Sequence, residues 1–72
     1  MVCKCIENSH GNTNFTVGKE YEMTKASRRE NDFGCIRTDF GGLFTAFQAY
    51  NKPKSYETGS VFEFALCKFE IL

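Results

Sequence analysis

FGCIRTDFGGLFTAFQ, residues 33–48, is the stretch that decides the fold class. Alternation of side chains over residues 33–38 predicts one strand, and the aromatic run over 43–48 predicts a second. Between them, Asp39-Phe40-Gly41-Gly42 supplies residues that tolerate the positive φ angles of a hairpin turn. We therefore expect an antiparallel β-hairpin here.

Strand-like segments separated by loops also occur on the N-terminal side of this hairpin. Residues 2–6 read as a first strand with Cys3 and Cys5 on one face, which we expect to point inward. Residues 7–14 form a polar loop rich in turn formers. Residues 20–25 read as a second strand, in which Tyr21 and Met23 alternate with polar residues. Residues 26–32 read as a charged turn.

The pattern toward the C-terminus is less regular. Residues 49–59 contain the only proline and read as a long loop. The tail has both helical and alternating spacing, and we interpret it as a short helical turn near 61–65 followed by a closing strand at 67–71. Five short strands without a long helix favour an all-β barrel or sandwich.

Composition limits the class of protein. The 72 residues leave room for one domain, residues 1–72, and nine Lys and Arg balance nine Asp and Glu. No net field attracts the whole molecule to nucleic acid or to a membrane. The sequence passes from Met1 directly into a strand pattern without the apolar segment of a signal peptide, so we expect a cytoplasmic protein with reduced cysteines.

Three short motifs add a resemblance. They are Lys4-Cys5-Ile6 followed by Asn8, then 15–21 (FTVGKEY), and then Asp39 to Gly42 before an aromatic strand. With the closing Lys68-Phe69-Glu70, the chain resembles a group of small SH3-like barrel proteins encoded by bacteriophages and prophages, although it has a longer insertion between Phe47 and Val61. The resemblance implies a small open five-stranded SH3-like barrel and a phage protein acting in the host cytoplasm. It implies no catalytic residue.

Catalysis and metal binding find little support in the sequence. The metal-ligand types are Cys3, Cys5, Cys35, Cys67 and His10, and they lack the tight Cys-x2–4-Cys spacing of structural zinc sites. We expect the cysteines to pack in the core, while their convergence on a metal inside the barrel stays open. The single histidine lies in a polar loop without a nucleophile motif, so we expect neither an enzyme nor a cofactor.

Two binding functions remain. The first is binding of single-stranded nucleic acid. Basic residues interleave with Tyr50 and Tyr56 in the long loop, and other basic residues form a second cluster before the hairpin. The candidate residues are Lys25, Arg28, Arg29, Lys52 and Lys54. Neighbouring acidic residues weaken this interpretation.

Protein binding is the other, and it is the function that we expect. Aromatic residues in or beside turns are candidate contacts: Phe40, Phe44, Tyr50 and Tyr56. The same rings could instead close the ends of the barrel. We expect these side chains to bind and inhibit a host protein, with a homodimer as a further option.

Overall fold

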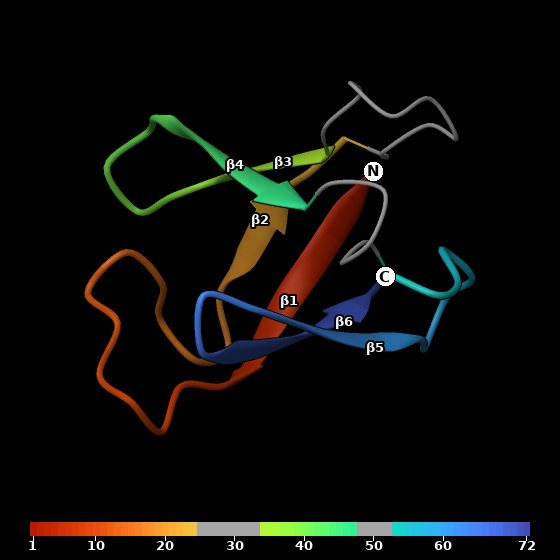
Figure 1. Cartoon of the computed structure of the whole chain (residues 1–72), viewed down its shortest axis with the longest axis horizontal. Coiled ribbons are helices and arrows are strands. Elements are labelled where there is room, and N and C mark those ends of the chain that lie inside the picture. The colour runs from red at the N-terminus through yellow and green to blue at the C-terminus, as the bar shows by residue number, and fades with distance from the viewer. Residues whose placement is uncertain (25–33, 48–52) are drawn as a thin grey trace.

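The computed structural model is an antiparallel β-protein (Figure 1). It describes residues 1–24, 34–47 and 53–72, and for the fourth strand it describes the backbone. These segments contain no helix and six strands: β1 (Val2–Glu7), β2 (Glu20–Glu22), β3 (Gly34–Arg37), β4 (Leu43–Phe47), β5 (Val61–Phe64) and β6 (Cys67–Ile71).

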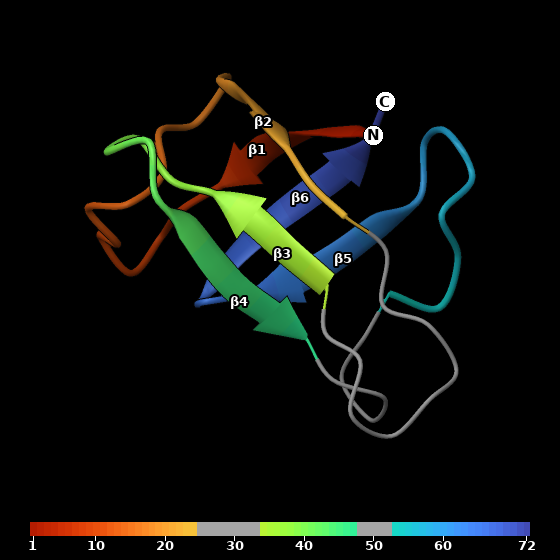
Figure 2. The ribbon, with the colours of Figure 1, turned by 90° about the horizontal axis from the view of Figure 1, so that it is seen from above.

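The strands form a four-stranded sheet in the order β2-β1-β6-β5 and a hairpin of β3 and β4. A backbone bridge between Met23 and Ile36 and a hydrogen bond from Thr24 N to Cys35 O (2.9 Å) join β2 to β3. Figures 1 and 2 show the hairpin lying over one face of the sheet. The chain is thus a two-layer structure whose layers are connected along β2 and β3.

The core fills the space between the layers. Its centre is Phe69, which is fully buried and lies 5.0 Å from the ring of Phe15 and 5.5 Å from the ring of Phe62. Burial of each such ring contributes roughly 1.5–3 kcal/mol. The remaining buried side chains come from most of the strands: Cys3, Cys5, Tyr21, Met23, Ile36, Cys67 and Ile71.

Several expectations are confirmed. Cys3 and Cys5 point inward from β1, and Tyr21 and Met23 are buried while Glu20 and Glu22 are exposed. The β3–β4 hairpin has the predicted turn, and β6 has the predicted bounds. The second strand is shorter than expected, at Glu20–Glu22; Met23, which follows it, donates its backbone N to Met1 O (2.8 Å) and also bridges to Ile36 of β3.

The prediction of a helical turn near residues 61–65 is wrong. Residues 61–64 form β5, which pairs with β6 through a two-residue turn at Ala65 and Leu66, so the described strands number six and not five. The misleading helical spacing has a simple origin: Phe62 and Phe69 are cross-strand partners on the inner face, and Leu66 lies at the turn between them. No stretch of helix in the described residues could cross a bilayer. The expected turn at 26–32 lies outside those residues.

Candidate functional site

The turn of the β3–β4 hairpin presents a phenylalanine to solvent. Phe40 is 77% exposed, more than the other large apolar side chains in the described residues. The turn is closed by hydrogen bonds from Thr38 N to Gly42 O (2.9 Å) and from Gly41 N to Thr38 O (3.1 Å). Gly41 takes a φ of 79°, which side-chain-bearing residues rarely adopt. The backbone beside Phe40 therefore has a defined conformation.

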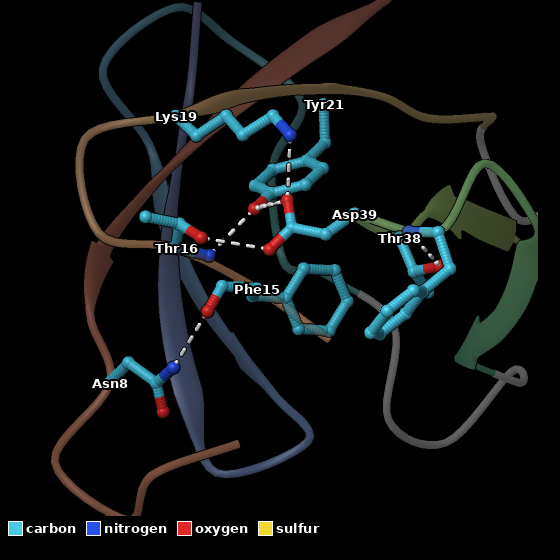
Figure 3. A network of polar contacts seen from close by, with 8 residues as sticks. Asn8, Phe15, Thr16, Lys19, Tyr21, Thr38 and Asp39 are labelled. Atoms are coloured by element: carbon cyan, nitrogen blue, oxygen red, sulfur yellow. Dashed lines mark hydrogen bonds and ion pairs between the residues drawn. The ribbon is translucent and has the colours of Figure 1, made fainter. Parts of the chain in front are cut away.

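Asp39 fastens this turn to the loop between β1 and β2 (Figure 3). Its carboxylate accepts hydrogen bonds from Thr16 Oγ1 (2.8 Å) and from the Tyr21 hydroxyl (2.7 Å), and Lys19 Nζ lies 2.9 Å from it. Its backbone N donates to Asn14 O (2.9 Å). We call Asp39, Thr16, Lys19 and Tyr21 the latch, because they connect two segments that are distant in the sequence.

The latch perturbs the titration of both acids in it. Hydrogen bonds from Lys19 first, and then from Tyr21 and Thr16, lower the pKa of Asp39 to about 2. Burial first, and then the bond to the Asp39 carboxylate, raises the pKa of Tyr21 to about 12. At neutral pH the carboxylate is therefore charged and the phenol is protonated, which is the pairing that the hydrogen bond requires.

Two asparagines hold the loop on the other side of the latch. Asn8 Nδ2 donates to Asn12 O (2.8 Å) and to Phe15 O (2.9 Å), and Asn8 Oδ1 accepts from Asn12 N (2.9 Å). Asn12 Nδ2 in turn donates to Ala65 O (3.0 Å) at the β5–β6 turn. The loop that receives Asp39 is thus itself tied to the sheet, so the latch has a firm support.

The charges around Phe40 are largely compensated. Lys19 pairs with Asp39, and Arg37 Nε lies 3.3 Å from Glu22 Oε2 while Arg37 Nη1 donates to Gly41 O (3.0 Å). Val17, in the loop that the latch holds, is 56% exposed. The arrangement can bury an aromatic ring in a partner at little cost in unpaired charge.

The cysteines are core residues. Cys3, Cys5 and Cys67 are buried, and burial is the first cause that raises the pKa of Cys3 to about 12 and that of Cys67 to about 11. Burial likewise raises the pKa of Cys5. These three are thiols at neutral pH, and a thiol must lose its proton before it can attack as a nucleophile. Cys35 is half-buried in β3, and the described residues contain no group of three or more metal-ligating side chains.

The other predicted contact residues lie in different places. Tyr56 is half-buried and packs against the core, which leaves less of its ring for a partner than Phe40 offers. Phe44 is in β4, where its side chain is not described. Lys54 is exposed. The remaining candidates are outside the described residues: Lys25, Arg28, Arg29, Tyr50 and Lys52.

The sequence interpretation did not find the latch. Asp39 was assigned to a turn and Tyr21 to the core, and both assignments are correct as far as they go. The bond between them joins residues that are 18 positions apart and becomes visible only when the hairpin is placed over the sheet. A buried tyrosine nevertheless requires a hydrogen-bond partner, and this is the one signal that the sequence held.

Comparison of the chain with protein families, with curated proteins and with solved structures finds no match.

Proposed function

We propose that the protein is a stoichiometric binding module, derived from a phage, that associates with a host protein in the cytoplasm and inhibits it by covering part of its surface. The observation that carries this proposal is Phe40, a large apolar side chain that is 77% exposed on a turn with a defined backbone. Large aromatic side chains that enter a partner's pocket dominate the energy of many interfaces.

The latch supports the proposal because it reduces the entropy lost on binding. A flexible turn has to be ordered when it meets a partner, and this ordering subtracts from the binding free energy. Here Thr16, Lys19 and Tyr21 hold Asp39, the neighbour of Phe40 in the chain, before any partner is present. The Phe40 backbone is thus preorganised for contact.

We also propose that the two layers together form an open SH3-like barrel. The connection of β2 to β3 through the Met23–Ile36 bridge supports this, because it makes one strand series from β5 through β6, β1, β2 and β3 to β4. In such a barrel the β3–β4 turn is a loop at the rim, a location from which loops commonly make contacts.

The experiment is a pull-down from bacterial lysate with the tagged protein, with and without nuclease, followed by mass spectrometry of the bound material. We expect one abundant protein that survives nuclease treatment and is lost with Phe40→Ala. Leu66→Ala is the matched control, because Leu66 is also apolar, 69% exposed and located in a hairpin turn.

Three outcomes would contradict the proposal. Capture that Phe40→Ala and Leu66→Ala leave equally intact removes the role of Phe40. Bound material that disappears with nuclease indicates a nucleic-acid protein, with Lys54 as the first described residue to test. A protein that forms a dimer and captures nothing else indicates self-association.

A further inference from the structure

β5 is an outer strand of the four-stranded sheet, and among the described residues no strand pairs with its outer edge. Phe64 and Cys67 flank the two-residue turn and are partners, and Ile71 N donates to Ser60 O (2.8 Å) at the other end of the ladder. Hydrogen-bonded pairs alternate along an antiparallel ladder, so the backbone groups of Phe62 and Phe64 face β6. Those of Val61 and Glu63 face outward, and no second strand in the described segments lies along them.

A groove runs beside this open edge. It has a volume of about 770 Å³ and is lined by residues 53–55, by residues 60–63 and by Lys68 of β6. The lining combines apolar surface from Pro53, Val61 and Phe62 with polar side chains. Groove volumes of roughly 300–1,000 Å³ are usual for ligand sites.

Three charged side chains line the groove. Lys54 and Lys68 line it together with one acid, Glu63. Lys68 Nζ is already 3.6 Å from Glu7 Oε2, whereas Lys54 is exposed and has no carboxylate partner among the described side chains. This cation suits a ligand that carries an acidic group.

We propose that this groove binds an extended peptide segment of a partner protein, which joins the sheet as a strand beside β5 and places an acidic side chain at Lys54. Unpaired backbone groups at a sheet edge provide the hydrogen bonds for strand addition, and the adjoining groove provides selectivity for side chains. Because residues 53–55 line the same groove as β5, a single extended segment fits beside this edge more readily than the folded edge of a second copy.

This surface is separate from the Phe40 site. Figures 1 and 2 place the β3–β4 turn and the segment of residues 53–60 on opposite sides of the molecule. The inference therefore does not depend on the proposed function, and Phe40→Ala leaves the groove unchanged.

The test uses a displayed library of random seven-residue peptides, selected against the immobilised full chain. We expect enrichment of peptides that combine β-branched or aromatic residues with an acid. A synthetic copy of the leading peptide should shift the amide resonances of Val61 and Glu63 in the ¹⁵N-labelled protein. Methylation of alternate peptide nitrogens should weaken binding by roughly tenfold, because it removes hydrogen bonds to the edge.

Variants of the protein can distinguish a loss of peptide binding at the β5 edge from a loss of folding. Val61→Pro removes an outward N–H without removing a ladder hydrogen bond, and proline is tolerated at the first residue of an edge strand. It should weaken the peptide by roughly tenfold, the equivalent of one hydrogen bond, while Val61→Thr retains binding. Lys54→Glu should reverse the preference for acidic peptides, and the amide spectrum of each variant checks that it is folded.

Several results would overturn the inference. They are the absence of any enriched peptide, resonance shifts centred on Phe40 instead of Val61, and equal binding of the N-methylated peptide. Concentration-dependent shifts of Val61 and Glu63 in the protein alone would assign the edge to a second copy. Binding to Phe40→Ala should equal binding to the wild type, so this result and that of the pull-down are independent.

Discussion

Asp39 does more than form a turn at the scale of the single residue. One carboxylate accepts hydrogen bonds from Thr16 and Tyr21 and an ion pair from Lys19, while its own N–H binds Asn14. Because these partners belong to the β1–β2 segment, the charge of Asp39 links the hairpin layer to the sheet layer. Its effect on stability should therefore depend on its protonation.

The pH dependence of stability has a definite sign. The pKa of Asp39 is about 2 in the folded protein and about 4 in an unfolded chain, so the latch contributes fully above about pH 4 and is lost as the pH falls toward 2. In thermal melts followed by circular dichroism, the melting temperature of the wild type should fall more steeply from pH 4 to pH 2 than that of Asp39→Asn. Glu57→Gln, at an exposed position, should behave as the wild type, and parallel curves for wild type and Asp39→Asn would disprove the role of the carboxylate.

The cysteines should differ in reactivity. Cys3, Cys5 and Cys67 are buried thiols with raised pKa values, whereas Cys35 is half-buried. Alkylation of the native protein at pH 8, mapped by mass spectrometry, should therefore modify Cys35 first and the other three only after denaturation. Early modification of Cys3 or Cys67 in the native protein would show that the reagent reaches the core and would contradict the burial of these thiols.

At the scale of the element, the β5–β6 turn carries backbone strain. Ala65 and Leu66 have φ angles of 54° and 62°, values at which residues with side chains lose roughly 1–2 kcal/mol each. The turn is nevertheless the connection that places Phe62 opposite Phe69. The hydrogen bond from Asn12 to Ala65 O helps to hold it.

Leu66→Gly should relieve part of this strain. Glycine adopts positive φ at no steric cost, and the exposed Leu66 side chain contributes little packing, so the free energy of unfolding should rise by about 1 kcal/mol in a urea titration. Gly41→Ala is the opposite change in the other hairpin, where φ is 79° and a Cβ would meet no atom within 4 Å. It should lower the free energy of unfolding by a similar amount, and a loss of stability with Leu66→Gly would contradict this account of the turn.

The elements differ in how far the sequence could predict them. Local chemistry specifies the β3–β4 hairpin, because Asp39 to Gly42 contains the turn residues, an alternating segment precedes them and an aromatic-rich segment follows. The β5–β6 hairpin lacks such a signal, since Ala65 and Leu66 are unfavourable turn residues that tertiary contacts hold in place. Its helical spacing was therefore misleading.

At the scale of the whole molecule, stability depends on a few aromatic rings. A chain of this length has on the order of 4–10 kcal/mol of stability in total. Phe69 is fully buried among Phe15, Tyr21 and Phe62, and truncation of such a ring typically costs about 3–5 kcal/mol. Each core ring thus contributes a large fraction of the total free energy of unfolding.

Phe69→Ala should leave little folded protein at 37 °C by circular dichroism. Phe40→Ala should melt within a few degrees of the wild type, because the Phe40 ring is 77% exposed and packs little in the fold. If Phe40→Ala destabilises the protein as much as Phe69→Ala does, Phe40 is a core residue and its exposure has no bearing on function.

The sequence could predict the all-β class of the molecule and the place of Phe40 in an exposed turn. All-β architecture, the inward faces of β1 and β2 and the candidate Phe40 follow from alternation and turn chemistry. The latch and the groove beside β5 could not be predicted, because each joins residues that meet only after the layers and loops have packed. Local patterns specify strands, whereas sites of this kind depend on how strands are placed.

The most direct test of the central claim is the dissociation constant of the captured partner for the wild type, Phe40→Ala and Asp39→Asn, measured by titration calorimetry with Leu66→Ala as the control. We predict at least about a thirtyfold loss for Phe40→Ala, the size expected of a residue that dominates an interface. Asp39→Asn should lose several-fold, because it loosens the turn without removing the ring, and Leu66→Ala should bind as the wild type does. Equal affinity of Phe40→Ala and the wild type would show that the latched turn is not the binding surface.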